Sequence, residues 1–197
     1  MKTRILLVTL LMAVGSVSAY AQATTEGTVQ RDANQQSRIE NGLKDGSLNV
    51  KEAGRLEKEQ ARVDRLQAKD LKDGKLSPAE RVQLRKAQDK ASRDIQAAKS
   101  NDVKGNPESK SSERLQADVQ RNVNQEKRIE QGVQSGALTQ RETAQLERGQ
   151  ANVDQKESSA AKNGHISAGE QGAIQRKEDH QSKRIHADKH NGVVRKE

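Results

Sequence analysis

Residues 38–52 read RIENGLKDGSLNVKE, and residues 128–142 read RIEQGVQSGALTQRE. In each stretch a glycine, Gly46 or Gly136, precedes a leucine, a short polar residue and, three positions after that, a glutamate. Glycine permits the positive φ that commonly ends a helix, and a short polar residue with Glu three positions on is the capping-box pattern that begins one. Each stretch therefore predicts a helix, a tight turn and a second helix.

The turn element belongs to an internal duplication with an offset of 90 residues, which aligns residues 31–42 with 121–132 and continues without a gap to Ile95 and Ile185. Within each copy the element recurs after 28 residues. Internal repeats of this kind mark repeated structural units. All four occurrences combine a glycine, an N-cap residue and a glutamate: Gly46, Asn49, Glu52; Gly74, Ser77, Glu80; Gly136, Thr139, Glu142; and Gly164, Ser167, Glu170.

Apolar residues form narrow stripes at helical spacing, such as Ile39 with Leu43, and no run alternates with period two. We therefore predict an all-α fold of two tandem three-helix units, each with a thin core of Leu, Ile, Val and Ala. The predicted helices cover residues 29–43, 50–70, 78–98, 115–133, 140–161 and 168–189. The predicted segments are unit one at 22–101, a linker at 102–114, and unit two with a basic, His-containing tail at 115–197.

The N-terminus has the pattern of a secretory signal peptide over residues 1–21. Lys2 and Arg4 precede an apolar run at 5–14, and Ala19-Tyr20-Ala21 fits the small-x-small cleavage pattern. The run is shorter than the roughly 20 residues that span a bilayer. We therefore expect cleavage before Gln22, no transmembrane segment in the mature chain, and a periplasmic or secreted location.

Composition excludes several classes of chemistry. The chain has no cysteine, and its only aromatic residue, Tyr20, lies in the predicted signal. Disulfides, thiol chemistry and stacking platforms for single-stranded nucleic acid are therefore excluded. The net charge of +8 is spread among interleaved acids and bases, and no phosphate loop, dinucleotide fingerprint or nucleophile motif is present. We predict a protein that is not an enzyme and has no specific nucleic-acid partner.

The turn elements also resemble the second half of an EF-hand calcium loop, in which a Gly precedes a Glu that binds the ion. Asn41, Asp45 and Glu52 form the best match, but position 3 of that loop is Leu43, which has no side-chain oxygen. Two interpretations are open, a weak calcium site or a capping box, and the capping box accounts for the pattern without a metal.

A second candidate metal site lies near the C-terminus. His186 and His190 are four residues apart on one helical face, and Asp179 lies seven residues before His186. Such a stripe suits a weak Zn, Cu or Ni site. The alternative is a solvated basic helix. No cofactor is predicted beyond such a weakly held divalent cation.

Polar residues kept in both copies form a third candidate, a binding face on the first helix of each unit. Their spacing of 0, 3, 4 and 7 residues places them on one side of a helix. Hydrogen bonds that fix the helix register are the favoured alternative. The residues are Arg31, Asn34, Gln35 and Arg38, with their counterparts Arg121, Asn124, Gln125 and Arg128. The further pairs Glu40/Glu130, Gln60/Gln150 and Asp64/Asp154 are also kept.

The pattern RIxxGxxxGxLxxxExxxLxxxQ, found from Arg38 to Gln60 and again from Arg128 to Gln150, resembles a family of small exported proteins of Gram-negative bacteria. The resemblance implies export and no particular activity. We expect a helical binding or scaffold protein that contacts an envelope protein or an anionic surface. The alternatives are a hydrophilin-like stress protectant, favoured by the mean hydropathy of −1.07, and a low-affinity divalent-cation binder.

Overall fold

A computed structural model describes residues 24–193, so the predicted signal peptide at 1–21 lies outside the described residues. The described chain is all-helical and contains no strand, which confirms the predicted fold class. A short 3-10 turn, Ala161–Asn163, follows the fifth helix. The helices are α1 (Thr25–Lys44), α2 (Val50–Asp70), α3 (Pro78–Ser100), α4 (Lys110–Gln134), α5 (Gln140–Ala160) and α6 (Ala168–Lys189).

The four predicted capping boxes are confirmed. Asn49, Ser77, Thr139 and Ser167 each accept a hydrogen bond from the backbone of the glutamate three residues on, and that glutamate's carboxylate accepts from the cap backbone. The four predicted glycines all have φ between 72° and 94°. An N-cap of this kind contributes about 1 kcal/mol to helix stability. Local sequence therefore fixes where α2, α3, α5 and α6 begin.

Two helices begin earlier than predicted. Thr24 caps α1, and Ser109 caps α4 through its side chain, which accepts from the Ser112 backbone. As a result α4 starts at Lys110, and its first five residues belong to the segment predicted as a linker at 102–114. Ser109 is an N-cap without a glutamate three residues on, so the capping-box pattern did not reveal it.

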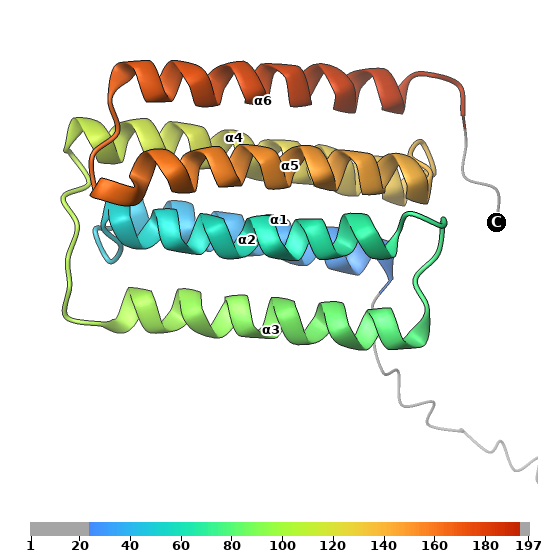
Figure 1. Cartoon of the computed structure of the whole chain (residues 1–197), viewed down its shortest axis with the longest axis horizontal. Coiled ribbons are helices and arrows are strands. Elements are labelled where there is room, and N and C mark those ends of the chain that lie inside the picture. Colours follow the sequence, from blue (N-terminus) through green and yellow to red (C-terminus); the bar gives the residue numbers. More distant parts are fainter. Residues whose placement is uncertain (1–23, 194–197) are drawn as a thin grey trace, which may run out of the picture.

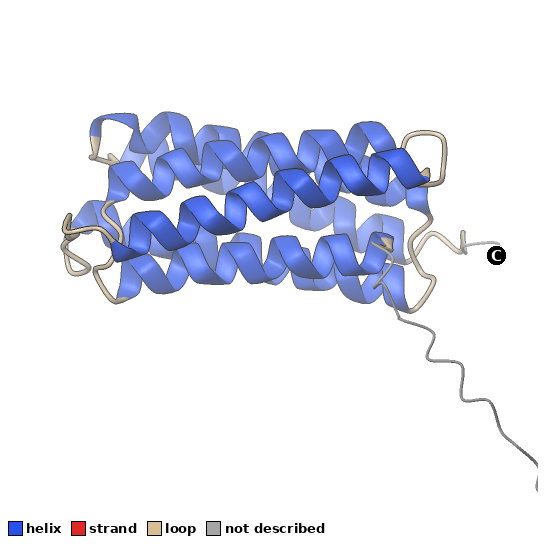
Figure 2. Cartoon of the chain, turned by 90° about the horizontal axis from the view of Figure 1, so that it is seen from below, coloured by secondary structure: helices blue, strands red, loops and turns tan. Residues whose placement is uncertain are grey.

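The helices run side by side along a common long axis (Figures 1 and 2). The most extensive contacts pair α2 with α5 and α1 with α4, and α3 and α6 flank this four-helix core on opposite sides (Figure 1). In the core, α1 and α2 of the first copy therefore each pair with their counterparts in the second copy.

The sequence predicts a thin, separate core within each unit. In the structure, one core is shared between the two copies. The largest apolar cluster joins residues of both copies, including Ile39, Leu56, Leu115 and Val153. A second cluster at the opposite end likewise joins Val29 of the first copy to residues of the second. Neither unit has enough large apolar residues for a core of its own, so pairing the copies roughly doubles the available apolar surface.

The middle of the core, between these apolar clusters, is polar. Gln88 of α3 donates to the Thr28 carbonyl at 3.0 Å and to Asp32 Oδ1 at 2.7 Å. Gln181 of α6 donates to the Leu146 carbonyl at 2.8 Å. The flanking helices are thus tied to the core by buried amides. Within residues 24–193, no helix is both long enough and apolar enough to cross a bilayer.

Candidate metal centre

The buried ionisable residues of the bundle are all acids. Among residues 24–193, buried positions include no Lys, Arg or His. An ionised carboxylate without a buried partner is costly in a protein interior, so this imbalance requires protons or bound cations. Eleven carboxylic acids are buried: Asp32, Glu40, Glu57, Asp64, Asp70, Asp118, Glu126, Glu147, Asp154, Glu157 and Glu178.

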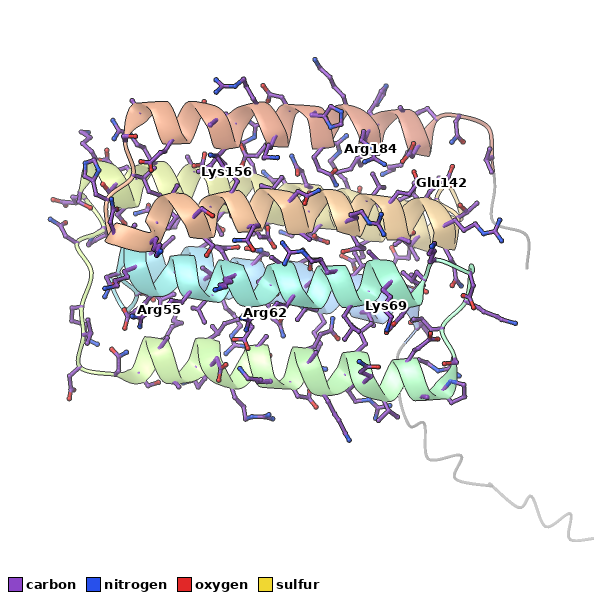
Figure 3. The ribbon with its side chains drawn as sticks, in the orientation of Figure 1. Arg55, Arg62, Lys69, Glu142, Lys156 and Arg184 are labelled. Carbon is purple, nitrogen blue, oxygen red and sulfur yellow. The ribbon has the colours of Figure 1, made fainter. Side chains whose placement is uncertain are left out.

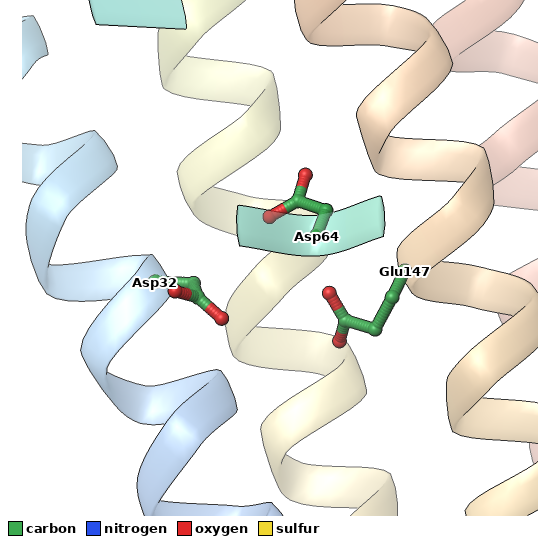
Figure 4. Close-up of side chains that lie close together, drawn as sticks. All are labelled: Asp32, Asp64 and Glu147. Atoms are coloured by element: carbon green, nitrogen blue, oxygen red, sulfur yellow. The ribbon is translucent and has the colours of Figure 1, made fainter. Parts of the chain in front are cut away.

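Three of these acids form the first triad, which consists of Asp32 of α1, Asp64 of α2 and Glu147 of α5. Each offers one oxygen, and these oxygens lie within 4.8 Å of one another. Figure 4 shows the three carboxyl groups converging from three helices on a common space. All three side chains are buried, and Glu147 is 0% exposed. The first triad therefore has the arrangement of a multi-helix cation site.

The second triad consists of Glu57 of α2 and of Asp154 and Glu157 of α5, whose oxygens also lie within 4.8 Å of one another. It is closed by Asn122 of α4, whose amide donates to Asp154 Oδ1 at 3.2 Å and to Glu157 Oε2 at 2.8 Å. All four residues are buried. Helices of both copies contribute to this triad as well.

The two triads are related by the duplication. An offset of 90 residues relates Asp64 to Asp154 and Glu57 to Glu147, so each of these pairs is shared between the triads. The remaining positions exchange acid and amide. Asp32 corresponds to Asn122, and Gln67, which lies beside Glu147, corresponds to Glu157. Equivalent positions in the two copies therefore supply each triad with its three carboxyls and with one neighbouring amide.

A fifth position distinguishes the triads. Glu126 of α4 lies close enough to Asp64 and Asp32 for their charges to raise its pKa, after burial itself. Its counterpart in the first copy is Gln36, which donates to Glu57 Oε2 at 3.0 Å. At this position the first triad therefore has a fourth carboxyl and the second has an amide, whereas the charges of Glu178 and Asp118 act on Glu157 of the second triad.

Burial raises the pKa of every acid in the triads. It raises the pKa of Asp32 and of Glu57 to about 7, although hydrogen bonds from Gln88 and Gln36 oppose the shift. Burial, followed by the charges of neighbouring carboxylates, raises the pKa of the others well above the ordinary range. These are Asp64, Glu126, Glu147, Asp154 and Glu157.

Two further buried acids lie beside the triads. Glu178 of α6 has its pKa raised to about 8 by burial and by the charge of Asp118. Arg121 lies 3.2 Å from Glu178 Oε2 but remains partly exposed. Burial also raises the pKa of Asp118 to about 7. The acidic region therefore extends from the triads towards α6.

Several carboxyl oxygens in the triads have no hydrogen-bond partner. Neither oxygen of Glu147 accepts a hydrogen bond, and Asp32 Oδ2, Asp64 Oδ2 and Asp154 Oδ2 are also unpartnered. Buried polar atoms are nearly always paired in folded proteins. Such oxygens, aimed at a common space, are suited to holding protons or a hard cation.

The sequence-predicted histidine site is not assembled as a three-ligand group. The His186 and His190 rings are adjacent, with centroids 4.3 Å apart, and His190 Nδ1 lies 2.7 Å from the His186 carbonyl. Asp179 instead pairs with Arg121, at 2.5 Å. Within the described chain, the two triads are the groups of three acids or histidines close enough to hold one ion.

The residues of the predicted calcium site make other contacts in the structure. Glu52 completes the capping box of α2, and its second oxygen accepts from Asn101 at 2.8 Å. Asp45 accepts hydrogen bonds from Ser47 and pairs with Lys99 at 3.3 Å. Asn41 supplies its backbone carbonyl to the end of α1. The structure therefore uses these side chains to shape a turn.

The predicted binding face on α1 and α4 contacts the flanking helices. Arg38 and Arg128 bond to Ser92 and Ser182, and Gln35 and Gln125 donate to the backbone of α3 and α6. Arg31 pairs with Asp89 at 2.9 Å, and Arg121 with Glu178 and Asp179. The structure thus joins these six residues to α3 and α6, while Asn34 and Asn124 are exposed.

Sequence reasoning noted the pair Asp64/Asp154 but missed Glu57 and Glu147. A signal was available. Along α2, acids and amides occupy a stripe at 57, 60, 64 and 67, and the same stripe recurs in α5 at 147, 150, 154 and 157. The spacing of three and four residues places each stripe on one helical face. A stripe free of basic residues in both copies indicates a polar interior.

No protein-family model matches the chain, and no curated protein or solved structure does. The candidate metal centre therefore stands on its residues and geometry, and the resemblance to exported proteins of Gram-negative bacteria remains a prediction.

Proposed function

We propose that this protein is a non-enzymatic cation-binding protein that holds one hard divalent cation at each triad. The observation that carries the proposal is the first triad itself, in which three buried carboxyls from three helices converge and neither oxygen of Glu147 has a hydrogen-bond partner. The absence of any buried base among residues 24–193 makes a cation the natural counterion.

The chemistry of the ligands points to a class of ion. The triads and their neighbours Gln67 and Asn122 offer only carboxyl and amide oxygens, which suit Mg²⁺, Ca²⁺ and Mn²⁺ rather than Zn²⁺ or Cu²⁺. In each triad the three oxygens lie within 4.8 Å of one another, so all three can contact a single ion of this class.

Burial supports a binding role over a catalytic one. Every triad side chain is buried, so a bound ion would have no face open to a substrate. A hydrolytic or redox metal site keeps an open coordination position. We therefore assign no reaction, and we infer that the ion holds α1, α2, α4 and α5 together.

The cellular location of the protein is a second part of this proposal. The pattern of residues 1–21 favours export, so we propose a periplasmic or secreted protein that serves as a helical binding or scaffold module of the envelope. Mass spectrometry of the protein recovered from the periplasm tests this. A mature chain that begins at Gln22 would support export, and a chain that retains Met1 would contradict it.

Thermal unfolding with and without cations tests the cation proposal. We expect Mn²⁺ or Ca²⁺ at millimolar concentration to raise the melting temperature of the chelator-treated protein, since an ion that binds only the native state stabilises it. The variant Glu147→Gln removes charge from the first triad and should lose much of the rise. The matched variant Glu113→Gln changes an exposed residue of α4 and should keep the whole rise.

Calorimetric titration gives a second readout. Heat from about two ions per chain supports the proposal, and no heat together with an unchanged melting temperature at millimolar Ca²⁺ and Mn²⁺ would overturn it. Equal shifts in Glu147→Gln and in the unaltered protein would place the ions elsewhere and would also contradict the proposed site.

The protectant alternative makes a different prediction for the same preparation. A hydrophilin-like chain is largely disordered in dilute solution, so its far-UV circular dichroism would be weak and would fade without a cooperative transition. The cation-binding proposal requires strong helicity that is lost cooperatively. A non-cooperative melt in the presence of saturating cation would favour the protectant.

A further inference from the structure

The outward face of α2 carries positive charge along its whole length. Each of its six exposed residues is a Lys or an Arg, at intervals of four and three residues that keep them on one side of the helix. At about 1.5 Å per residue, this row is about 27 Å long. Figure 3 shows Arg55, Arg62 and Lys69 along α2. The row consists of Lys51, Arg55, Lys58, Arg62, Arg65 and Lys69.

The neighbouring helices extend this charge into a broad surface. A groove between α2 and α5 is lined by Lys51, Arg55, Lys58 and Lys162, and no acid lines it. Its counterpart in the other copy is lined by four bases, including Arg141 and Arg148, and again by no acid. We call this surface, made by the outward sides of α2 and α5 with both grooves, the basic face.

A third groove, between α5 and α6, continues the basic face. It is lined by Arg176, Lys177, His180 and Arg184, without an acid. Arg184 belongs to this groove and to the preceding one. The positive surface is therefore at least three helices wide.

The outward sides of α1 and α4 differ in kind. Their exposed residues include amides, such as Gln30, Asn34, Asn124 and Gln131, among fewer bases. Exposed bases are thus denser along α2 than along α1 or α4. A charge distribution of this kind favours an extended anionic partner.

We propose that the basic face binds the phosphate headgroups of an anionic membrane surface. A two-dimensional array of Lys and Arg matches a two-dimensional array of phosphates, and such residues attract anionic lipid within a Debye length. The described chain contains no aromatic residue apart from histidine, so it lacks the stacking platforms with which proteins bind single-stranded nucleic acid. The helices lie side by side (Figure 2), whereas proteins that read duplex DNA commonly place a single helix in its major groove.

The contact would be peripheral and electrostatic. The exposed large apolar residues of the described chain are Val82, Val103 and Val193, and none of them belongs to α2 or α5. The face therefore has no apolar side chains to insert among acyl chains. The triad acids point into the core, so this proposal does not depend on the cation site.

Vesicle co-sedimentation tests the proposal, with the chain that begins at Gln22 and keeps every described helix. We expect binding to phosphatidylcholine vesicles that contain about 30% phosphatidylglycerol and none to phosphatidylcholine alone. Raising the salt from about 50 mM to about 500 mM should weaken binding at least about tenfold. Binding that ignores lipid charge or salt would overturn the proposal.

Two variants with the same net charge locate the contact. Arg55→Gln, Lys58→Gln, Arg62→Gln and Lys69→Gln together neutralise the basic face and should weaken binding at least about tenfold. The matched control neutralises four exposed lysines away from α2 and α5, namely Lys86→Gln, Lys104→Gln, Lys110→Gln and Lys127→Gln, and should bind as the unaltered protein does.

Circular dichroism melts check that both variants fold alike, as substitutions at exposed positions should allow. Equal losses of binding in the two variants would show that net charge alone is responsible and would refute a specific face. A mixed-sequence oligonucleotide provides the last comparison. Tight binding to it, lost in the face variant while vesicles remain unbound, would assign the face to nucleic acid instead.

Discussion

Asp64 of α2 and Asp154 of α5, which are the same position in the two copies, lie close enough in the polar middle of the bundle for the charge of Asp64 to raise the pKa of Asp154. Each belongs to a different triad, so this pair connects the two triads. Burial raises the pKa of both carboxyls, and the negative charges around them raise it further. Two such carboxyls retain charge together only when a cation or a shared proton compensates them.

The substitution Asp64→Asn should therefore have opposite effects on stability and on cation binding. Without cations at pH 8, it removes a carboxyl whose pKa is raised by burial, and it should raise the free energy of unfolding by about 1 kcal/mol or more. With Mn²⁺ or Ca²⁺, it removes a ligand and should abolish much of the rise in melting temperature. Urea unfolding with a chelator, followed by thermal unfolding with the ion, measures both effects.

The control is Glu108→Gln, which alters an exposed carboxyl before α4. It should change neither quantity, because an exposed charge is well solvated. If Asp64→Asn destabilised the cation-free protein and kept the full cation effect, the role of Asp64 as a ligand would be wrong.

Stability without cations should fall as the pH rises. The triad acids have a higher pKa in the folded than in the unfolded chain, so the folded state binds more protons between the two values. Their contribution is complete below about pH 4 and is lost as the pH rises through about 7 for Asp32 and Glu57. The contribution of Glu178, which lies beside the triads, is lost through about pH 8. Each such carboxyl contributes up to about 1.4 kcal/mol per pH unit across its window.

Urea unfolding from pH 5 to pH 8.5 in the presence of a chelator measures this decline. Saturating Mn²⁺ or Ca²⁺ should flatten it, since the ion replaces the protons. The capping carboxyls of Glu80 and Glu170 have a lowered pKa, so their opposite effect is confined to acid pH. Stability that rises from pH 5 to pH 8 without cations would contradict the buried, protonated state of the triads.

The two triads should bind cations with different affinities. Glu126 adds a fourth carboxyl beside the first triad, whereas Gln36 stands at the equivalent position beside the second. Because affinity for hard cations rises with the number of charged ligands, Glu126→Gln should weaken the tighter step by about tenfold and make the two steps alike. Gln36→Glu should strengthen the weaker step. Calorimetric titration resolves the two steps, and a result in which both variants alter the same step would disprove this assignment.

Packing of α6 should depend on a single glycine of α5. A Cβ added at Gly149 would lie 1.9 Å from Gln181 Oε1, so Gly149→Ala must displace the amide that donates to the Leu146 carbonyl. We expect a loss of about 1–3 kcal/mol in the free energy of unfolding. The matched change Gly172→Ala, within α6, meets nothing closer than 3.6 Å and should stabilise the helix by about 0.5–1 kcal/mol. Urea midpoints for both variants test the contact, and equal effects would contradict it.

The helices themselves were readable from the sequence. Asn49, Ser77, Thr139 and Ser167, each with its glutamate, specify where four helices begin, because a cap acts through hydrogen bonds between residues three apart. Gly46 and its three counterparts specify the turns for an equally local reason, the conformational freedom of glycine. The duplication and the all-α class also follow from patterns visible along the chain.

The candidate site was only partly readable. The paired positions Gln60/Gln150 and Asp64/Asp154 stand out because both copies keep them, but an amphipathic pattern does not show whether a polar stripe faces solvent or another helix. Glu57 and Glu147 lie beside Leu56 and Leu146 and face the interior only because α2 packs on α5. The single-site candidates at Asp45 and His186 followed short motifs, which carry no information about distant partners.

What the sequence by itself determined was where α2, α3, α5 and α6 begin and the charge pattern of each helix, since these depend on contacts within a few residues. What only the tertiary structure decided was the pairing of α1 with α4 and of α2 with α5. That pairing arises because neither copy has enough apolar surface for a core of its own. This pairing brings acidic side chains between positions 32 and 157 of the chain into one interior. Because these carboxyls lose their solvent there, polar stripes on separate helices together form a candidate cation site.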